Sequence, residues 1–596
     1  MFKPVEMCKV NLLVLNRHVA ELTNRLGKME VMHLVDANEQ SSRHLLKSQE
    51  AGDTHLLNQL SGKCSRLIRQ LNIPDGSEKA TELPIQKLKE RLNEIDRQYG
   101  ENNRELSELL TRVNNAKQAL WEDNPADQES LQDVADEENA RQINAKGKLA
   151  EGIQESAKAD GEPQTESLEE LQGNLALCKE KMSRLANENA SELRAMKSQI
   201  EQMEMMQDIQ GHFGHLKRLT CISGWIPKSE LDAVKAVVAE VTEETGMVQV
   251  VSASKDARVR LGKEKVPTKM NGNAFTRPFQ MLVSNFGMPA YNEIDPSLFF
   301  GISFVLLFGY MFGDIGQGLV LALVGLWAKF TKREFGKAVR DAGMLLMMCG
   351  LCAICFGFAY GSVFGYEHLF DSLWVNPMKS SDVAELLLTA VGVGTVFISI
   401  AIIFNIINHI RAKRLFDGTV ERFGIVGLLF FWFCLFLGAW LMSGHEFSKW
   451  MLVPLALPLV LIFVREPLHN ALHHHGLFQG GFIGVFLECC IGVMETLTGY
   501  FSSTVSFVRV GAFAISHAAL CFAVFTLAGM MSNVAFGGLL KILIIVLGNI
   551  LVICFEGMVA MIQCVRLEYY ELFGKYFQGD GIPYSPFCLK KQEQGN

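Results

Sequence analysis

The stretch ECCIGVMETLTGYFSSTVSFVRVGAFAISHAALCFAVFTLA, residues 488 to 528, is predominantly apolar over more than a bilayer span, yet it contains charged and hydroxyl groups. Glu488, Glu495, Ser502 and Arg509 recur in it every seven residues. Because a seven-residue repeat drifts by only about 20° per step on an ideal α-helix, these side chains form one stripe. The stretch therefore predicts a long membrane helix with a polar stripe along one face.

Seven further apolar runs accompany this one and indicate a multi-pass α-helical membrane protein. The eight runs lie at residues 296–312, 315–330, 341–363, 384–409, 423–443, 449–464, 483–531 and 537–577. The first two are short and closely joined. The last two exceed the usual span, so we expect them to be tilted or bent. We predict a transmembrane, ion-translocating domain over residues 286–596 with about eight crossings.

The last run repeats the polar stripe. Asn549, Glu556 and Gln563 are again seven residues apart, and Arg566 follows one turn later. A charged side chain near the centre of a membrane helix costs at least about 3 kcal/mol and is seldom kept without a polar partner or a water-filled cavity. Two such stripes on neighbouring runs indicate a shared aqueous path.

Arg509 is the most unusual of these groups, because a guanidinium cannot usefully lose its proton. It is poorly suited to carrying protons itself, but it can force a passing carboxyl group to ionise by opposing it at close range. Simpler explanations remain open. Arg509 could snorkel or hold a structural ion pair, His517 could be a satisfied core histidine, and Glu488 could lie at the membrane surface.

Basic residues orient the runs. The two basic loops lie between the second and third runs (Lys329, Lys332, Arg333, Lys337, Arg340) and between the fourth and fifth (Arg411, Lys413, Arg414, Arg422). The charged first thirty residues show no cleavable signal pattern. With eight crossings, the positive-inside rule puts both basic loops and both termini in the cytoplasm. The modest length and the lack of a secretory signal favour the plasma membrane of a bacterium or archaeon.

Residues 1–285 are expected to form a cytoplasmic arm. Two apolar seams with alternating spacings of three and four predict helices at 85–120 and 168–208. Each seam is narrow, so the helices should fold back on each other as an antiparallel coiled-coil rod. At about 1.5 Å per residue, either helix would reach roughly 50 Å or more. The acidic segment 121–166 between them has few strand-forming residues and forms a tip whose degree of order the sequence leaves open.

Two patterns of strand, amphipathic helix and strand flank the rod, at residues 8–35 and 219–251. We predict that the segments 1–80 and 211–260 pair into one small α/β lobe. Neither pattern holds a phosphate-binding loop or a dinucleotide fingerprint, so any ATP chemistry would belong to another chain. The net charge of -8 comes without a basic block, which argues against nucleic-acid binding.

Two groups of potential metal ligands have simpler explanations. Cys349, Cys352 and Cys355 lie inside an apolar run, where this spacing is ordinary helix packing. The segment 466–475 contains one Glu and four His and could bind a metal or sense pH, but a solvated cytoplasmic loop is the simpler reading. We expect reduced thiols and no metal or cofactor.

Three stretches carry a family resemblance. Residues 501–528 look like the penultimate helix of the membrane stator subunit of V/A-type ATPases, called subunit a or subunit I. Residues 296–318, with Met-Phe-Gly-Asp at 311–314, resemble the first hairpin of that family. The stretch EGMVAMIQCVRLEYYELFGKYFQGDGIPYSPF at 556–587 resembles its closing segment. The resemblance spans nearly the whole chain.

The resemblance implies a stator that forms two ion half-channels beside a proteolipid rotor ring. Arg509 would face the ring carboxylate, and Arg566 would be a second arginine on the neighbouring helix. Glu495, Glu556 and His517 match polar half-channel positions. With the two stripes, the candidate ion-translocation residues are Arg509, Arg566, Glu495, Glu556, His517, Glu488, Gln563, Ser502 and Asn549.

In that family the cytoplasmic arm contacts peripheral stalks and the central stalk and catalytic head, so this chain is expected to be non-catalytic by itself. Two features depart from the family pattern: Gln317 stands where an aromatic residue is frequent, and the tip is smaller and more acidic than the usual distal lobe. The alternative is a stand-alone secondary transporter or ion channel with a regulatory coiled coil. No inverted repeat with paired broken helices supports that alternative.

Overall fold

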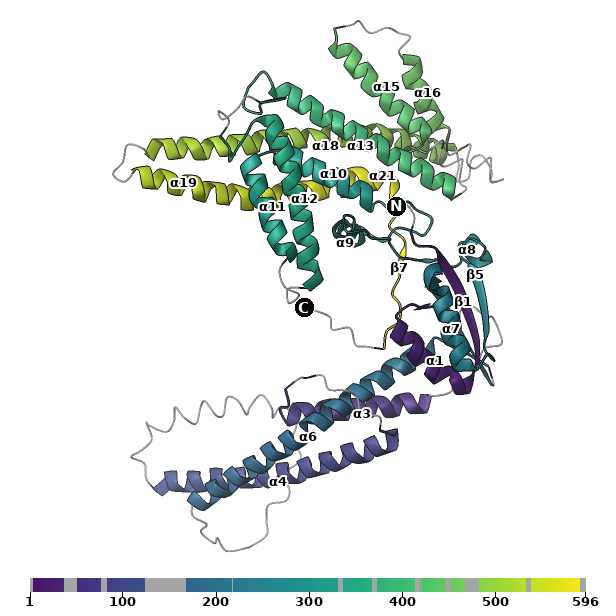
Figure 1. Cartoon of the computed structure of the whole chain (residues 1–596), viewed down its shortest axis with the longest axis vertical. Helices are drawn as coiled ribbons and strands as arrows, with labels where there is room; N and C mark the ends of the chain where they lie inside the picture. The colour runs from purple at the N-terminus through teal and green to yellow at the C-terminus, as the bar shows by residue number, and fades with distance from the viewer. Residues whose placement is uncertain are drawn as a thin grey trace.

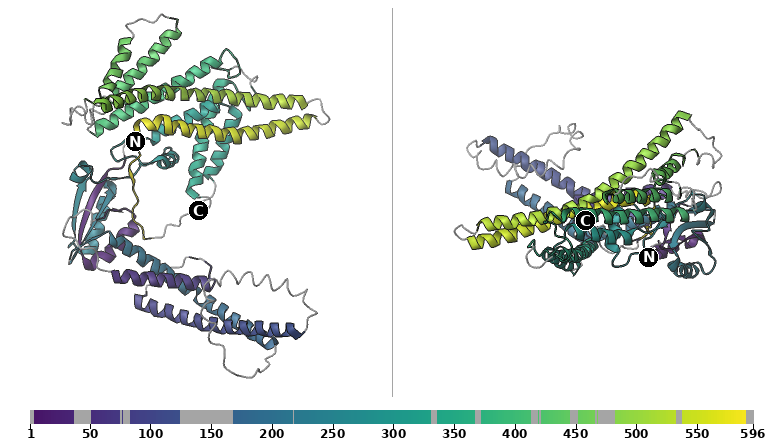
Figure 2. Two further views of the ribbon diagram at one scale, coloured as in Figure 1. Left: turned by 180° about the vertical axis from the view of Figure 1, so that it is seen from behind. Right: turned by 90° about the horizontal axis from the view of Figure 1, so that it is seen from above.

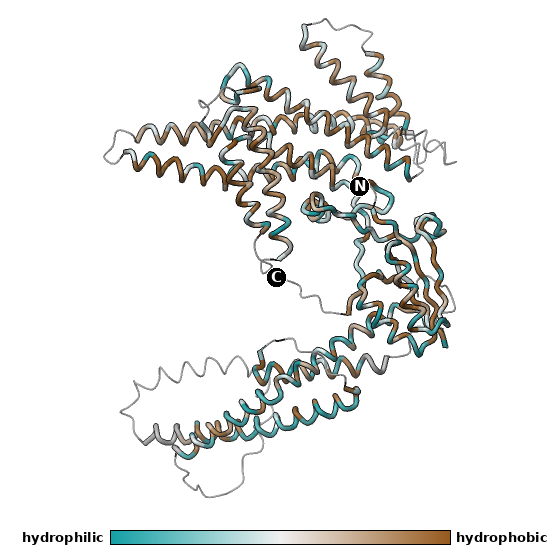
Figure 3. The backbone as a smooth tube through the Cα atoms, in the orientation of Figure 1, coloured by the Kyte–Doolittle hydropathy of each residue, from teal (hydrophilic) through white to brown (hydrophobic). Residues whose placement is uncertain are grey.

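The computed structural model describes residues 4–36, 51–74, 76, 83–123, 168–216, 218–330, 336–366, 372–412, 419, 421–444, 452–465, 467, 482–531 and 537–589. Figure 1 shows a long helical rod, a lobe that contains a sheet, and a bundle of helices, and two further views agree (Figure 2). Figure 3 shows that hydrophobic residues concentrate in the bundle and hydrophilic residues in the rod. This division follows the contrast between the two halves of the sequence.

The sheet is antiparallel, with β1 (Met7–Leu15) in its interior. This strand pairs with β4 (Leu219–Pro227) along its whole length and with β5 (Met247–Ser252) on the other side. The strand order is β2-β4-β1-β5, where β2 is His33–Leu34, and β3 (Gly214–His215) also pairs with β4. Strands from the two predicted patterns thus form one sheet.

Helices α1 (Asn16–Met29) and α7 (Leu231–Thr242) cover one face of this sheet. Alternate residues of β1, which point to the same side of a strand, pack with apolar residues of both helices. On the opposite side, the Lys9 ammonium is buried and lies 2.6 Å from the Glu264 carboxylate. That ion pair fastens the segment after β5 to the centre of the sheet.

The rod contains α4 (Ile85–Asp123) and α6 (Leu168–Gly211), which cover the two predicted helical ranges. Arg91 Nε lies 3.0 Å from Glu192 Oε1, and the Cys178 thiol donates to the Asn102 carbonyl at 3.6 Å. Residue numbers fall on one helix as they rise on the other, so the helices run antiparallel. Residues 124–167, which include most of the predicted tip, lie outside the described part of the chain.

A third helix, α3 (Ala51–Gln70), packs against α6 and α4 at the end of the rod nearer the lobe. Its buried residues Leu60, Cys64 and Leu67 face the seam of the other two helices. The rod is therefore a three-helix bundle at this end, which the two-seam prediction did not include.

In the described residues, four helical segments are long and apolar enough to cross a membrane: Ala338–Tyr360, Val383–Arg411, Ile483–Met530 and Gly538–Tyr576. Shorter apolar helices occupy the positions of the other four predicted runs: α10 (Ser297–Met311), α11 (Ile315–Phe330), α15 (Ile425–Met442) and α16 (Leu452–Phe463). A helical membrane protein is confirmed at this level. Eight crossings remain a prediction.

Helix α18 (Phe482–Met530) has 49 residues, so it is about 70 Å long at 1.5 Å per residue. Helix α13 (Val383–Arg411) packs against it, and so does the segment that starts with α19 (Gly537–Leu551). That segment continues through η6 (Val552–Glu556), α20 (Gly557–Arg566), η7 (Leu567–Phe573) and α21 (Gly574–Tyr576). In Figure 1 the hairpin of α11 and α12 (Gly336–Tyr360) crosses these long helices at a steep angle.

Glycines let α11 and α12 approach closely. A Cβ at Gly350 would lie 2.5 Å from the backbone nitrogen of Ala322, and one at Gly357 would lie 2.4 Å from that of Ile315. Gly343, Gly350 and Gly357 are seven residues apart, as are Gly318 and Gly325 on the facing helix. Small residues at such an interface bring two backbones into contact, as is common in membrane helix pairs.

The segment after α21 ties the helical bundle to the lobe. Strand β7 (Ile582–Pro583) pairs in parallel with β6 (Pro267–Thr268). The Tyr584 hydroxyl then donates to the Val31 carbonyl, and the Phe587 amide donates to the Met32 carbonyl at 3.0 Å. The remaining short helices are η2 (Lys228–Glu230), α8 (Ala257–Arg260) and α9 (Arg277–Phe286).

Candidate functional site

Helix α18 has a buried seam on one face. The predicted polar stripe lies on an adjacent face, because its residues Glu495, Ser502 and Arg509 each directly precede a seam residue. The seam residues are all at most 5% exposed and alternate by four and three: Thr496, Tyr500, Ser503, Phe507, Val510, Ala514, His517 and Cys521. In the stripe, Glu488, Glu495 and Ser502 are exposed and Arg509 is partly buried. The stripe thus lies largely on the outside of the described chain.

Arg509 has no counter-charge in ion-pair contact within the described ranges. Its Nη1 atom is buried and has no hydrogen-bond partner there. The charged side chains within electrostatic range are Arg566, which is exposed, and Glu571. Gln563 lies one turn before Arg566, and its Oε1 atom is likewise buried without a partner. Uncompensated polar atoms of this kind call for a partner such as water, an ion or another chain.

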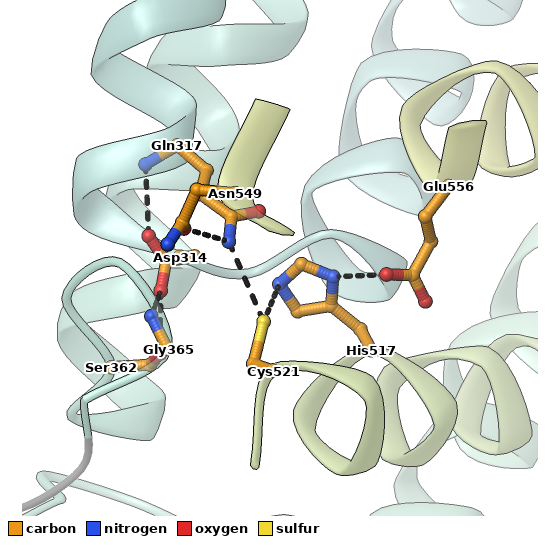
Figure 4. Close-up of polar contacts among 8 residues, drawn as sticks. All are labelled: Asp314, Gln317, Ser362, Gly365, His517, Cys521, Asn549 and Glu556. Carbon is orange, nitrogen blue, oxygen red and sulfur yellow. Dashed lines mark hydrogen bonds and ion pairs between the residues drawn. The ribbon is translucent and has the colours of Figure 1, made fainter. Parts of the chain in front are cut away.

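His517 and Glu556 form a buried pair between α18 and η6. His517 Nδ1 lies 2.8 Å from Glu556 Oε2, and the two residues are 3% and 6% exposed (Figure 4). The structure therefore brings together two predicted residues that are 39 positions apart. This pair can hold or pass a proton through a charge-assisted hydrogen bond.

Gln317 extends this pair toward Asn549. Its Nε2 donates to Asn549 Oδ1 at 3.0 Å and to Cys521 Sγ at 3.4 Å, and Cys521 Sγ lies 4.0 Å from His517 Nε2. Figure 4 shows the row of polar groups from α11 through α18 to η6. We call Glu556, His517, Cys521, Gln317 and Asn549 the His517 cluster.

A small pocket adjoins the His517 cluster. It is lined by Ala514, His517 and Ala518 of α18, and by residues just after α10, at the end of α12 and in the connection before α13: Gly313, Tyr360, Ser362 and Pro377. A second pocket includes Cys521 and Asn549 in its lining. The buried polar row is thus adjacent to the connection between the third and fourth apolar runs.

Asp314 holds that connection in place. Its buried carboxylate accepts hydrogen bonds from the Gln317 amide at 2.9 Å, the Ser362 hydroxyl at 2.6 Å, and the Phe364 and Gly365 amides at 2.9 and 2.7 Å. The same carboxylate therefore caps α11 and orders the turn after α12. Neither role was predicted from the sequence, although Asp314 lies in one of the quoted motifs.

Glu495 occupies a different setting, near the start of α18. It forms an ion pair with Arg422, and both side chains are more than a third exposed. The Tyr500 hydroxyl donates to the Arg422 carbonyl at 2.8 Å, which fixes the chain before α15 against α18. Glu495 and the His517 cluster lie on opposite sides of Arg509 along the helix.

The structure adds Lys575 and Ser503 to this region. The Lys575 ammonium is buried and donates to Ser503 Oγ at 2.8 Å. It also lies 4.9 Å from the ring centre of Phe423 and 5.9 Å from that of Tyr500, within the range of cation–π attraction. The sequence feature that could have identified Ser503 is its place among residues spaced alternately by three and four. It directly follows the predicted Ser502.

No cluster of His, Cys, Asp and Glu suited to a metal ion occurs among the residues described. Cys349 is buried, Cys352 is partly buried and Cys355 is exposed, so the three thiols do not converge. The histidines of segment 466–475 lie outside the described ranges.

Comparison with known proteins identifies relatives. Residues 153–392 and 468–589 match the model of the V-type ATPase 116kDa subunit family. A-type ATP synthase subunit I of Methanothermobacter thermautotrophicus is 25% identical over 429 residues, covering 69% of this chain and 58% of that protein. The subunit I of Methanocaldococcus jannaschii is 24% identical and that of Halobacterium salinarum 23%, with 74% and 72% of this chain covered. The alignments span 65% and 70% of those two proteins.

Replacement of Asp314 tests the anchor beside the cluster. Asp314→Ala removes all four acceptor contacts and leaves buried amides unpaired, so we expect a loss of stability of about 3 kcal/mol or more. Asp382→Ala is the matched control, because Asp382 precedes α13 in a similar way but is only partly buried. Thermal unfolding of the purified protein in detergent measures both variants. Equal shifts in the two midpoints would contradict the anchoring role.

Proposed function

Because this chain belongs to the V-type ATPase 116kDa subunit family, we propose that it is the membrane stator subunit of a rotary V/A-type ATPase or ATP synthase. In this proposal it is non-catalytic by itself. It forms two ion half-channels and supplies the arginine that makes a rotor-ring carboxylate release its ion.

The guanidinium of Arg509 is the observation that carries the proposal. It lies midway along a very long apolar helix, on a stripe that faces outward, and no described carboxylate pairs with it. A permanent cation in that setting favours the ionised form of any carboxyl group that comes close. A rotor ring that turns past α18 would bring such a carboxyl group to it.

The His517 cluster is the proposed half-channel on the non-cytoplasmic side. Its polar groups are buried, connected to one another, and adjacent to pockets at the connection between the third and fourth apolar runs. The positive-inside rule assigns that connection to the side opposite the basic loops. Asn549, Glu556 and His517 then lead an ion from that side toward Arg509.

The exposed stripe from Glu488 through Glu495 to Ser502 is the proposed cytoplasmic half-channel. The pairing of Glu495 with Arg422 supports the cytoplasmic assignment, because Arg422 is the last basic residue of the loop between the fourth and fifth apolar runs. The exposure of these residues supports a path between α18 and the ring, where water can reach them.

The mechanism follows from the order of these groups. An ion enters one half-channel, binds a ring carboxylate, travels almost a full turn through lipid, and leaves by the other half-channel after the carboxylate meets Arg509. Arg566, with Gln563 beside it, adds positive charge at the same level. Because both arginines stay charged, they also oppose direct passage of cations between the half-channels.

The rod and lobe are the proposed contact with peripheral stalks and the central stalk and catalytic head. The antiparallel helices α4 and α6 support a strut of this kind, and the segment after α21 fastens it to the bundle. Both termini and the arm lie in the cytoplasm in this proposal. The protein resides in a plasma membrane, as expected for a bacterium or archaeon.

Co-purification separates this function from that of a stand-alone transporter or channel. We expect the tagged chain, extracted in mild detergent, to bring a proteolipid ring and ATP-hydrolysing subunits with it. Solute or ion transport by the single chain reconstituted alone would support the transporter and contradict the stator.

Removal of the fixed charge tests the mechanism. In Arg509→Ala, we expect the complex to assemble and ATP-driven ion uptake into vesicles to fall to background, because the ring carboxylate no longer meets a cation. Lys541→Ala removes an exposed cation from α19 and serves as the control with normal uptake. Normal uptake in the Arg509 variant would refute the assignment.

Loss of the half-channel acids should slow transport without abolishing it. We expect Glu495→Gln and Glu556→Gln each to lower the rate of ATP-driven uptake up to roughly tenfold, equivalent to about 1.4 kcal/mol in barrier height, because water can partly substitute. Glu556→Gln should be the more severe, since it also removes the charge that faces His517. A double variant with the wild-type rate would remove both acids from the path.

A further inference from the structure

The last apolar segment carries two buried carboxyl groups, and each lies in a π-helical turn. Glu556 ends η6, and Glu568 is the second residue of η7. Such wider turns inside a helix occur frequently at functional sites, because they redirect side chains that a regular helix would place elsewhere. Glu556 has a partner in His517, whereas the function proposed so far assigns no role to Glu568.

Glu568 is fully buried, and the Ser303 side chain is a polar neighbour of its carboxyl group. Glu568 is 0% exposed, and neither of its carboxylate oxygens accepts a hydrogen bond from the described part of the chain. The Ser303 hydroxyl borders it, but that hydroxyl donates to the carbonyls of Phe299 at 2.8 Å and Phe300 at 3.3 Å. The ionised form of a carboxyl group in this position is strongly unfavourable unless a ligand completes its surroundings, whereas the protonated form is tolerated.

A second uncompensated group lies nearby. Tyr576 is 3% exposed, its hydroxyl has no partner in the described ranges, and it is within electrostatic range of Glu568, Asp295 and Glu293. Glu293 and Asp295 are also buried, at the chain entry to α10. In the predicted topology this entry is on the cytoplasmic side. Tyr576 is therefore an electrostatic neighbour both of Glu568 and of the two acids at the entry to α10.

We propose that Glu568 is a further relay residue for the transported cation, on the cytoplasmic side of Arg566; this rests on the stator function proposed above. For a proton, one carboxylate oxygen of Glu568 accepts it from water and later returns it to water near Tyr576, and no other bond changes. For sodium, the same oxygens and the tyrosine hydroxyl replace water in its coordination shell. This interior route runs beside α10 and is separate from the exposed stripe at Glu495.

Substitution by methionine separates transport from structure. An unpaired buried carboxyl contributes nothing favourable to stability, so Glu568→Met should assemble and unfold at the wild-type temperature or higher. We expect ATP-driven proton or sodium uptake, measured separately in vesicles, to fall roughly tenfold or more. Glu568→Asp, which keeps the ionisable group, should recover a substantial part of the uptake, and that recovery is not expected from a packing role.

Glu421→Gln is the matched control, because it also removes a carboxyl group at the cytoplasmic end of the bundle. Glu421 lies 3.0 Å from His409 and belongs to neither proposed ion path. If Glu568→Met does not assemble, the isosteric Glu568→Gln carries the test, since it removes only the ionisable proton. Wild-type uptake in the methionine or glutamine variant, or failure of both to assemble, overturns the relay.

The Arg509→Ala variant, measured in parallel, separates the two proposals. Loss of uptake there with normal uptake in Glu568→Met overturns the relay alone. Normal uptake in Arg509→Ala overturns the stator function on which the relay rests.

Discussion

An ionisable side chain inside an apolar helical bundle needs a counter-charge, a polar shell or a partner from outside, and this requirement organises the bundle. The described residues satisfy it in different ways. His517 and Glu556 are buried against each other, and Lys575 lies between two aromatic rings with one hydroxyl acceptor. Glu495 pairs with Arg422 where both reach solvent. Arg509 has no such partner in the described chain, so its partner has to be water, an ion or another chain.

Helix α18 carries its buried seam and its polar stripe on faces that are one residue apart. Its seam residues Thr496, Ser503 and Val510 directly follow the stripe residues Glu495, Ser502 and Arg509. Neighbouring residues on a helix point about 100° apart, so the seam can pack on α10 and α13 while the stripe stays at the surface. The same seven-residue period keeps both faces aligned along the helix. One continuous helix of 49 residues therefore carries both patterns.

The long apolar helices, the two rod helices and the strands of the lobe could be predicted from the sequence. Burying one face of a helix or strand requires apolar residues at a fixed spacing along the chain, and that spacing is visible in the sequence. The family resemblance was confirmed by the family match. The contact between Gln317 and Asn549 could not be predicted, because it joins residues 232 positions apart through the packing of α11 on the last segment. Glu568 was missed for a different reason. An α-helical period places side chains incorrectly once a π turn intervenes; η6 lies within the second stripe, and η7 begins directly after its last residue, Arg566.

In the proposed motor, the lack of a carboxylate partner for Arg509 among the described residues would be a functional requirement. A carboxylate of this chain held against the guanidinium would neutralise it in every state of the motor. Arg509 would then interact almost equally with a protonated and an ionised ring carboxyl group, and an interaction that is equal in two states shifts no equilibrium between them. Glu495 lies 14 residues before Arg509 on α18, about 21 Å away along the helix, and pairs with Arg422, while Glu556 pairs with His517. Neither acid is a counter-charge for Arg509 in the described structure. If the chain is the proposed stator, this pattern of paired and unpaired charges leaves the field of one guanidinium available to a group on another chain.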